Sequence, residues 1–209
     1  MLKINKRSEP PDLTEWKKNN PHGRYDKLTG PVRQIIRKYA LQEQFYLCAY
    51  CCQRIEDIKS CHNEHIEAQK LNPNRTLDFS NIVASCNTPN QCGKAHQSQP
   101  LPLNPLMVEC ETELRFKMSG RVEGLSDRAK DTIQVLNLGD DEKNNRALIE
   151  KRKQLCDALL LTNGINTDEG LEDEELLEML IRDLSQPEQD KMEPFALVLI
   201  NILQNWLSS

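Results

Sequence analysis

The chain has 209 residues and a mass of 24.1 kDa, which suits one domain or a small domain with a helical extension. Hydrophobic residues make up 38% and aromatic residues 5%, so few aromatic platforms are available for stacking the bases of single strands. The longest apolar run near the carboxyl end is too interrupted for a transmembrane helix, and residues 1–7 show no signal peptide. We therefore expect a cytoplasmic protein.

The net charge of −5 is divided unevenly along the chain. Residues 1–100 carry 15 Lys and Arg against 10 Asp and Glu, whereas residues 101–209 carry 12 against 22. A basic first half could meet a polyanion, and an acidic second half would repel one. A solvated surface with a local charge bias is the plain alternative.

The first third of the chain predicts an arm, a helix and a short strand. Residues 1–30 are rich in Pro, Asn, Lys and Gly, which favours an extended arm with turns. A helix is expected to open at Pro31, because proline suits the first helical turn. The apolar residues 45–47 suit a short strand that enters the first cysteine pair.

The last part of the chain predicts a hairpin followed by helices. Residues 114–118 alternate and end at Ser119-Gly120, which is a hairpin signal. After an acidic stretch at 168–178 two apolar stripes follow, most simply core, although part of them could dock another subunit. The helices are expected at 127–136, from the Asp140-Asp141 turn to Leu161, at 172–184 and at 188–207.

Eight cysteines in a chain without a secretory signal need an explanation. Disulfides are not expected in a reducing compartment. Six of the eight, and three of the four histidines, fall within residues 48–96, and such clustering of soft ligands points to a metal.

Four cysteines form two pairs that suit a structural zinc ion. Cys48 and Cys51 make a C-x-x-C pair, and Cys86 and Cys92 make a wider second pair. Four thiolates favour a closed tetrahedral zinc site that staples the intervening segment. Three alternatives stay open: buried inert thiols, a redox role for the first pair, and replacement of one ligand by Cys61 or His62.

The motifs between and around these pairs resemble a known family. The order C-x-x-C, acidic-His-Ile, Asn-aliphatic and C…C resembles an HNH nuclease with the ββα-metal motif over about 50 residues. From Cys48 to about Arg152 the chain is similar to PtuB nucleases, the HNH subunits of Septu-type and related retron antiphage systems. The segments that carry this likeness are 48–51, 62–66, 77–86, 109–114 and 135–138, with 3–6 and 9–10 at the amino end.

The resemblance implies an α+β fold in three parts. A zinc-stapled ββα-metal core would occupy 46–125. A basic N-terminal arm and helix would precede it at 1–45, and an acidic helical region at 126–209 would form a partner-docking surface.

Phosphodiester hydrolysis needs an activated water and a Lewis acid. His65 is the candidate general base, because neutral imidazole can accept a proton near pH 7. The resemblance implies that Glu64 binds a catalytic divalent cation, magnesium or manganese, although on a strand it would point away from His65 unless the strand bends or ends there. Asn81 matches the middle residue of the motif and would fix the loop that aims His65; a helix cap before Ile82 is the alternative.

The third position of the motif is the least certain in register. His96 follows Cys92 by four residues, so on a helix both would share a face, and His96 is expected to bind the cation. Asn87 and Asn90 are its rivals, whereas His22 reads as a loop residue. Four basic side chains around the site could contact phosphates: Lys59, Lys70, Arg75 and Lys94.

Together these features predict an endonuclease subunit that cleaves DNA or tRNA. The resemblance implies a PtuA-like ABC/SMC-type ATPase as partner, and a retron RNA–DNA element could reach the chain through that complex; no membrane is involved. The alternative is a non-catalytic zinc-finger interaction module in which Glu64 and His65 are incidental. The sequence leaves open the substrate, the activating signal, whether the ATPase restrains or activates the nuclease, and the stoichiometry.

Overall fold

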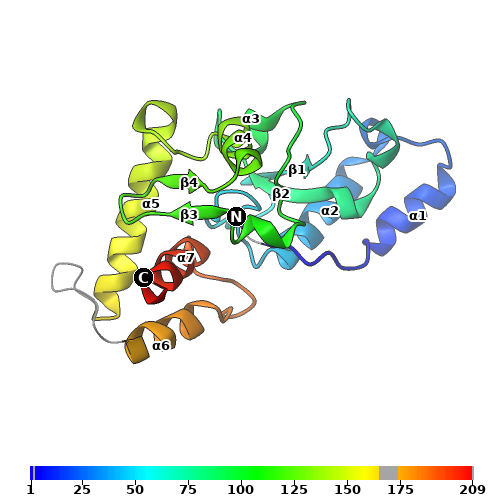
Figure 1. The fold of residues 1–209 in the computed structure, drawn as a ribbon. Helices are drawn as coiled ribbons and strands as arrows, with labels where there is room; N and C mark the ends of the chain where they lie inside the picture. The colour runs from blue at the N-terminus through cyan, green and yellow to red at the C-terminus, as the bar shows by residue number, and fades with distance from the viewer. Residues whose placement is uncertain (2, 165–173, 209) are drawn as a thin grey trace.

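A computed structural model describes residues 1, 3–164 and 174–208 (Figure 1). It is an α+β structure with two separate two-stranded antiparallel sheets, β1–β2 and β3–β4. The strands are β1 (Cys61–His65), β2 (Ile82–Cys86), β3 (Leu114–Phe116) and β4 (Val122–Gly124). The helices are α1 (Pro11–Asn19), α2 (Gly30–Glu43), α3 (Gly93–His96), α4 (Asp127–Leu136), α5 (Glu142–Thr162), α6 (Glu174–Leu184) and α7 (Ala196–Leu207).

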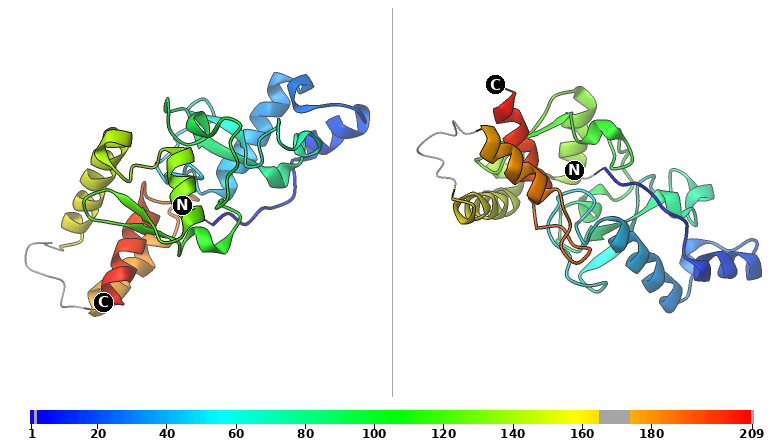
Figure 2. Two further views of the ribbon diagram at one scale, coloured as in Figure 1. Left: turned by 45° about the horizontal axis from the view of Figure 1, so that its top comes forward. Right: turned by 90° about the horizontal axis from the view of Figure 1, so that it is seen from below.

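The two sheets lie in different parts of the molecule. The β1–β2 sheet packs on α2, whereas the β3–β4 hairpin packs against α4 and α7 (Figures 1 and 2). One continuous apolar core runs from Met1 through the cysteine loop to α7. Among the helices that the structure describes, none combines the length and apolar character that a membrane crossing requires.

The amino-terminal segment is extended only over residues 3–10. The expectation of an arm through residue 30 is wrong for α1, which begins at Pro11. Proline presets the helical φ at this position, Asp12 lies in the first turn, and two lysines lie in the last turn, where each charge complements the helix dipole. Leu13 anchors the helix, since its side chain is fully buried.

The extended arm is fixed to the core through Lys6. Its ammonium pairs with Glu43 at 2.6 Å, donates to the Ile82 carbonyl at 2.8 Å and lies 3.8 Å from the centre of the Phe79 ring. Burial lowers the pKa of Lys6, against the opposing effect of Glu43. This lysine therefore holds α2 and β2 together and is not available on the surface.

The predicted strand at 45–47 is replaced by a tight turn. Phe45 and Tyr46 have φ angles of 49° and 61°, and Leu47 makes only an isolated bridge to Arg54. The amide of Tyr46 donates to the Leu41 carbonyl at 2.9 Å, which closes the end of α2. The chain reverses here because α2 must deliver the cysteine loop onto β2.

The second half agrees with the sequence more closely. The hairpin is confirmed, with Gly120 at φ +80° in its turn. The helices expected at 127–136 and after Asp140-Asp141 are confirmed as α4 and α5. Residues 165–173, which include part of the predicted acidic stretch and the expected start of α6, lie outside the described residues.

The last helix is shorter than predicted. Residues 188–191 form a bridged turn, and α7 begins only after Phe195, whose φ of 59° is left-handed. The apolar stripes of the last two helices face each other and the core. The buried residues of these two helices are Leu177, Leu180, Leu184, Ala196, Val198, Leu199, Ile200, Ile202 and Leu203.

Gln44 joins the end of α2 to the edge of β2 that faces away from β1. Its side-chain amide accepts from the Ala84 N–H at 2.7 Å and donates to the Ala84 carbonyl at 2.9 Å, and the side chain is fully buried. It therefore acts as one residue of an additional strand. The same amide also donates to the Leu47 carbonyl at 2.8 Å, so it fixes the turn into the cysteine loop.

Replacing Gln44 by Leu should lower the free energy of unfolding by about 2 kcal/mol, because the Ala84 N–H would lose its buried partner. Urea unfolding followed by circular dichroism measures the change. Gln42→Leu is the matched control on the exposed side of α2 and should stay within about 0.5 kcal/mol. Equal stabilities for Gln44→Leu and the control would contradict the bridging role.

Candidate functional site

The four predicted cysteines come together. The sulfur atoms of Cys48, Cys51, Cys86 and Cys92 all lie within 4.8 Å of one another, and all four residues are buried. A tetrahedral zinc ion with Zn–S bonds of about 2.3 Å would place its sulfurs about 3.8 Å apart. The cluster could therefore hold zinc with little adjustment.

Local backbone geometry explains why this spacing works. Cys52 and Cys92 have positive φ angles, of 63° and 53°, so the chain turns sharply beside both pairs. The insertion between Cys86 and Cys92 forms a loop that is fixed to α4, since the Cys92 amide donates to the Leu136 carbonyl at 2.8 Å. The wide second pair is thus compatible with one compact site.

The surroundings of the cluster suit a negatively charged zinc–thiolate centre. The Cys86 amide donates to the Cys48 sulfur at 3.4 Å. Arg152, on α5, is fully buried and its Nε has no hydrogen-bond partner among the described residues. Burial lowers the pKa of Arg152, while the charges of Cys51 and Cys52 act in the opposite direction. Four thiolates around one divalent cation carry a net negative charge, which would compensate this guanidinium.

Neither proposed substitute ligand belongs to the cluster. Cys61 pairs in register with Cys86 across β1–β2, but its sulfur faces the carbonyls of Asp57 and Ile58 at 3.8 and 3.9 Å. His62 contacts Glu64 instead. The expectation that either could replace a cysteine ligand is therefore wrong for this arrangement.

His65 is the last residue of β1 and is held by its ring nitrogens. Its Nε2 lies 2.9 Å from the Thr76 carbonyl, which can only accept, so Nε2 carries the proton. The other nitrogen, Nδ1, accepts from the Gln69 amide at 3.3 Å. Burial lowers the pKa of His65 from its ordinary value near 6.5, so the ring is neutral at pH 7. Its Nδ1 can then accept a proton.

Asn81 braces the loop that carries these partners. Its side-chain oxygen accepts from the Glu67 amide at 2.8 Å, and its side-chain nitrogen donates to the carbonyls of Glu67 and Arg75 at 3.1 and 3.4 Å. The residue is 1% exposed. It precedes β2, not a helix, so the alternative of a helix cap is wrong.

Glu64 lies between two histidines. Its Oε1 contacts His96 Nδ1 at 2.6 Å, and its Oε2 contacts His62 Nε2 at 3.3 Å. Burial alone would raise the pKa of Glu64, but these two hydrogen bonds hold it below its usual value. His96 reaches this position because α3 begins directly after Cys92 and is one turn long.

Glu64 and His65 line one cavity of about 380 Å³. They are neighbours on β1, but the strand ends at His65, which lets both reach the same space. The remaining lining residues include Asn63, Gln69 and Lys70. A buried base and a carboxylate thus face one opening that is large enough for solvent and a phosphate group.

The predicted basic residues differ in availability. Arg75 forms ion pairs with Glu67 and Asp78, so its charge is already satisfied within the loop. Lys59, Lys70 and Lys94 are exposed, and Lys70 lies at the cavity. The rivals for the third motif position are also separated, since the Asn90 carbonyl accepts from Asn137, directly after α4, whereas Asn87 contacts His62.

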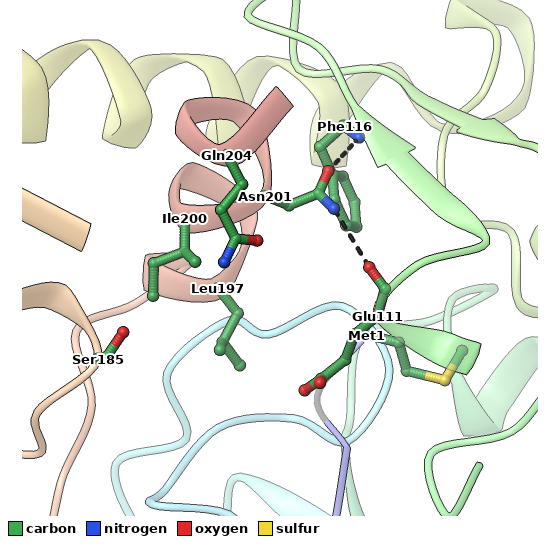
Figure 3. A pocket seen from close by; sticks show the side chains of 8 residues that line it. All are labelled: Met1, Glu111, Phe116, Ser185, Leu197, Ile200, Asn201 and Gln204. Carbon is green, nitrogen blue, oxygen red and sulfur yellow. Dashed lines mark hydrogen bonds between the residues drawn. The ribbon is translucent and has the colours of Figure 1, made fainter. Parts of the chain in front are cut away.

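A second hollow of about 170 Å³ lies where the amino terminus, β3 and α7 meet (Figure 3). Asn201 crosses it, accepting from the Phe116 amide at 2.9 Å and donating to the Glu111 carbonyl at 3.3 Å. These polar groups are satisfied within the chain, so this hollow serves as a structural joint.

Several site residues escape sequence reasoning. Tyr25 packs edge-on against the His65 ring with centroids 4.7 Å apart, and its hydroxyl accepts from Asn63 at 2.8 Å. Thr76 and Gln69 set the tautomer of His65 from the following loop. None of them belongs to a local motif, because each acts through a contact that only the folded chain creates.

Replacing Cys51 by Ser should abolish stoichiometric zinc binding and destabilise the fold, since a structural zinc site contributes apparent free energies of about 10–16 kcal/mol. Elemental analysis of the purified chain and its thermal melting measure both effects. Cys156→Ser is the control, because Cys156 is buried on α5 outside the cluster. Full zinc content in the Cys51 variant would refute the assignment.

Replacing Asn81 by Ala should release the loop from Glu67 and misplace His65, and a shift of about 1 Å can cost about 100-fold in rate. The loop's opening is measurable directly as faster amide exchange at Glu67. Asn72→Ala is the matched control, since the Asn72 side chain donates to the Glu67 side chain and not to its backbone. Unchanged exchange at Glu67 would show that Asn81 does not brace the loop.

No protein-family model matches the chain. The chain is similar to a protein of Escherichia coli named "Retron Ec83 putative HNH endonuclease", with 31% identity over 98 residues. The match covers 41% of this chain and spans only 37% of the length of that relative. This distant relationship supports a nuclease role of the HNH type for a chain that could hold zinc on four cysteines.

Proposed function

We propose that this chain is a metal-dependent HNH-type endonuclease subunit that hydrolyses phosphodiester bonds of DNA or tRNA. The observation that carries the proposal is the buried His65, whose unprotonated Nδ1 lines one cavity with the carboxylate of Glu64. The two antiparallel strands, followed after the loop of residues 87–92 by the turn of α3, support a ββα-metal core, with the cysteine cluster stapling its ends.

In this proposal His65 is the general base. The Thr76 carbonyl holds its proton on Nε2, so the lone pair is on Nδ1, where the attacking water would replace the Gln69 amide that donates to it at 3.3 Å. Asn81 holds the loop that carries the Thr76 carbonyl, because its side chain forms hydrogen bonds with the backbone of Glu67 and Arg75. The base therefore accepts a proton from water in one fixed orientation, which favours in-line attack on a phosphate in the cavity.

The carboxylate of Glu64 and the ring of His96 fit a divalent cation, magnesium or manganese. Both side chains are buried, and Glu64 Oε1 lies 2.6 Å from His96 Nδ1, so a cation would replace the proton between these two atoms. Such a cation supplies Lewis-acid stabilisation of the charge that develops on the phosphate and its leaving oxygen. Lys70 at the cavity would hold the nucleic acid backbone.

The partner in this proposal is a PtuA-like ABC/SMC-type ATPase within an antiphage system, through which a retron RNA–DNA element could act. The name of the relative places that protein in a retron, which supports a retron-associated system as the setting proposed here. The acidic balance of residues 101–209 supports a division of labour in which a partner supplies much of the grip on nucleic acid.

The test is cleavage of plasmid DNA and of total tRNA by the chain with its co-purifying proteins, with magnesium, manganese or chelator. His65→Ala should slow single-turnover cleavage by about 10²–10⁴-fold. The rate should also fall as the pH is lowered below 6.5, because burial lowers the pKa of His65 and only the neutral ring is active.

His22→Ala serves as the control, since His22 is exposed and lies outside the site. Wild-type cleavage by His65→Ala would exclude His65 as the base. Absence of cleavage of either polymer by a zinc-loaded, partner-bound chain would instead favour the non-catalytic zinc-finger interaction module.

A further inference from the structure

A third side chain at the Glu64 centre is not assigned by the motif. His62 lies two residues before Glu64 on β1, so both side chains leave the same face of the strand. The His62 Nε2 is 3.3 Å from Glu64 Oε2, and the side chain is 20% exposed. It is thus placed at the open side of a centre whose other histidine, His96, is fully buried.

The protonation of His62 is set by Asn87. The Asn87 side-chain nitrogen donates to the Lys59 carbonyl at 3.0 Å, which identifies the atom facing His62 as the amide oxygen. That oxygen lies 3.1 Å from His62 Nδ1 and can only accept, so Nδ1 carries the proton. The nitrogen that faces Glu64 is then Nε2, and a bound cation would replace its hydrogen bond of 3.3 Å to the carboxylate.

His96 shows the same arrangement from the other side. Its Nε2 donates to the Gln99 carbonyl at 2.8 Å, and its Nδ1 faces Glu64 Oε1 at 2.6 Å. One nitrogen of each imidazole therefore faces one oxygen of the Glu64 carboxylate, and a bound cation would take the place of the protons in these two hydrogen bonds. Histidines that bind metals are oriented in this way, each by a hydrogen bond from its other nitrogen.

Gly93 keeps the space at this centre open. A Cβ atom at this position would lie 2.6 Å from both the Glu64 Oε2 and the His62 Nε2. Any side chain here would displace the two groups. The absence of a side chain at the first residue of α3 thus matches a centre that must accommodate an ion.

We propose that His62 is a third protein ligand of the catalytic cation, together with Glu64 and His96. This inference rests on the proposed function for the use of the ion, but the ligand set is independent of cleavage. Two imidazoles and one carboxylate form a softer donor set than carboxylates alone, which favours manganese and other divalent transition metals over magnesium.

The test measures manganese binding to the zinc-loaded full chain by electron paramagnetic resonance, with magnesium as competitor. The wild type should bind manganese at one site, and a large excess of magnesium should displace it poorly. His62→Ala should weaken manganese binding about 100-fold, and Asn87→Ala about tenfold, by releasing the orientation of the His62 ring. Zinc content and melting temperature should remain unchanged in both variants.

His22→Ala is the matched histidine control and should bind manganese as the wild type does. Equal manganese affinity in His62→Ala and the wild type would overturn the inference, even with cleavage intact. Absence of manganese binding in the wild type would overturn it as well. If manganese binding depends on His62 but the chain cleaves no nucleic acid, the ligand set would be supported and the proposed nuclease function would be contradicted.

Discussion

Four buried sulfur atoms determine where the rest of the site can lie. Cys48 and Cys51 belong to the turn after α2, Cys86 ends β2, and Cys92 precedes α3. Segments this short bury few apolar side chains of their own, because β1 and β2 have five residues each and α3 has four. A zinc ion on these sulfurs would supply the constraint that the small core lacks.

Only part of the candidate site depends on that constraint. His96 reaches Glu64 because α3 begins directly after Cys92. His65 faces the cavity that Glu64 also lines, because β1 ends at His65. The loop from residue 66 to 76 is held separately, by Asn81, which directly precedes β2. Base and carboxylate are therefore positioned by different supports, so damage to one support need not remove the other.

The sequence predicted those parts that depend on local spacing. The cysteine pairs, the hairpin, α4 and α5 follow from motif spacing and periodicity, and Glu64, His65, Asn81 and His96 follow from the resemblance. It did not predict α1, the turn at 45–47 or the late start of α7, since left-handed residues such as Phe45 and Phe195 carry no glycine signal. Tyr25 was missed as a site residue, and His62 was considered only as a substitute zinc ligand, because their contacts arise only when distant segments meet.

The buried guanidinium of Arg152 extends the influence of the cysteine cluster along the chain. It lies on α5, well after Cys92, the last cysteine of the cluster. Its hydrogen bonds run to two backbone carbonyls and to no carboxylate among the described residues. Loss of the ion and protonation of the thiols would leave this charge buried without compensation, at a cost of several kcal/mol. The helix would then open in the same cooperative step as the cysteine loop, so that α5 and the cluster form a single unit of local unfolding.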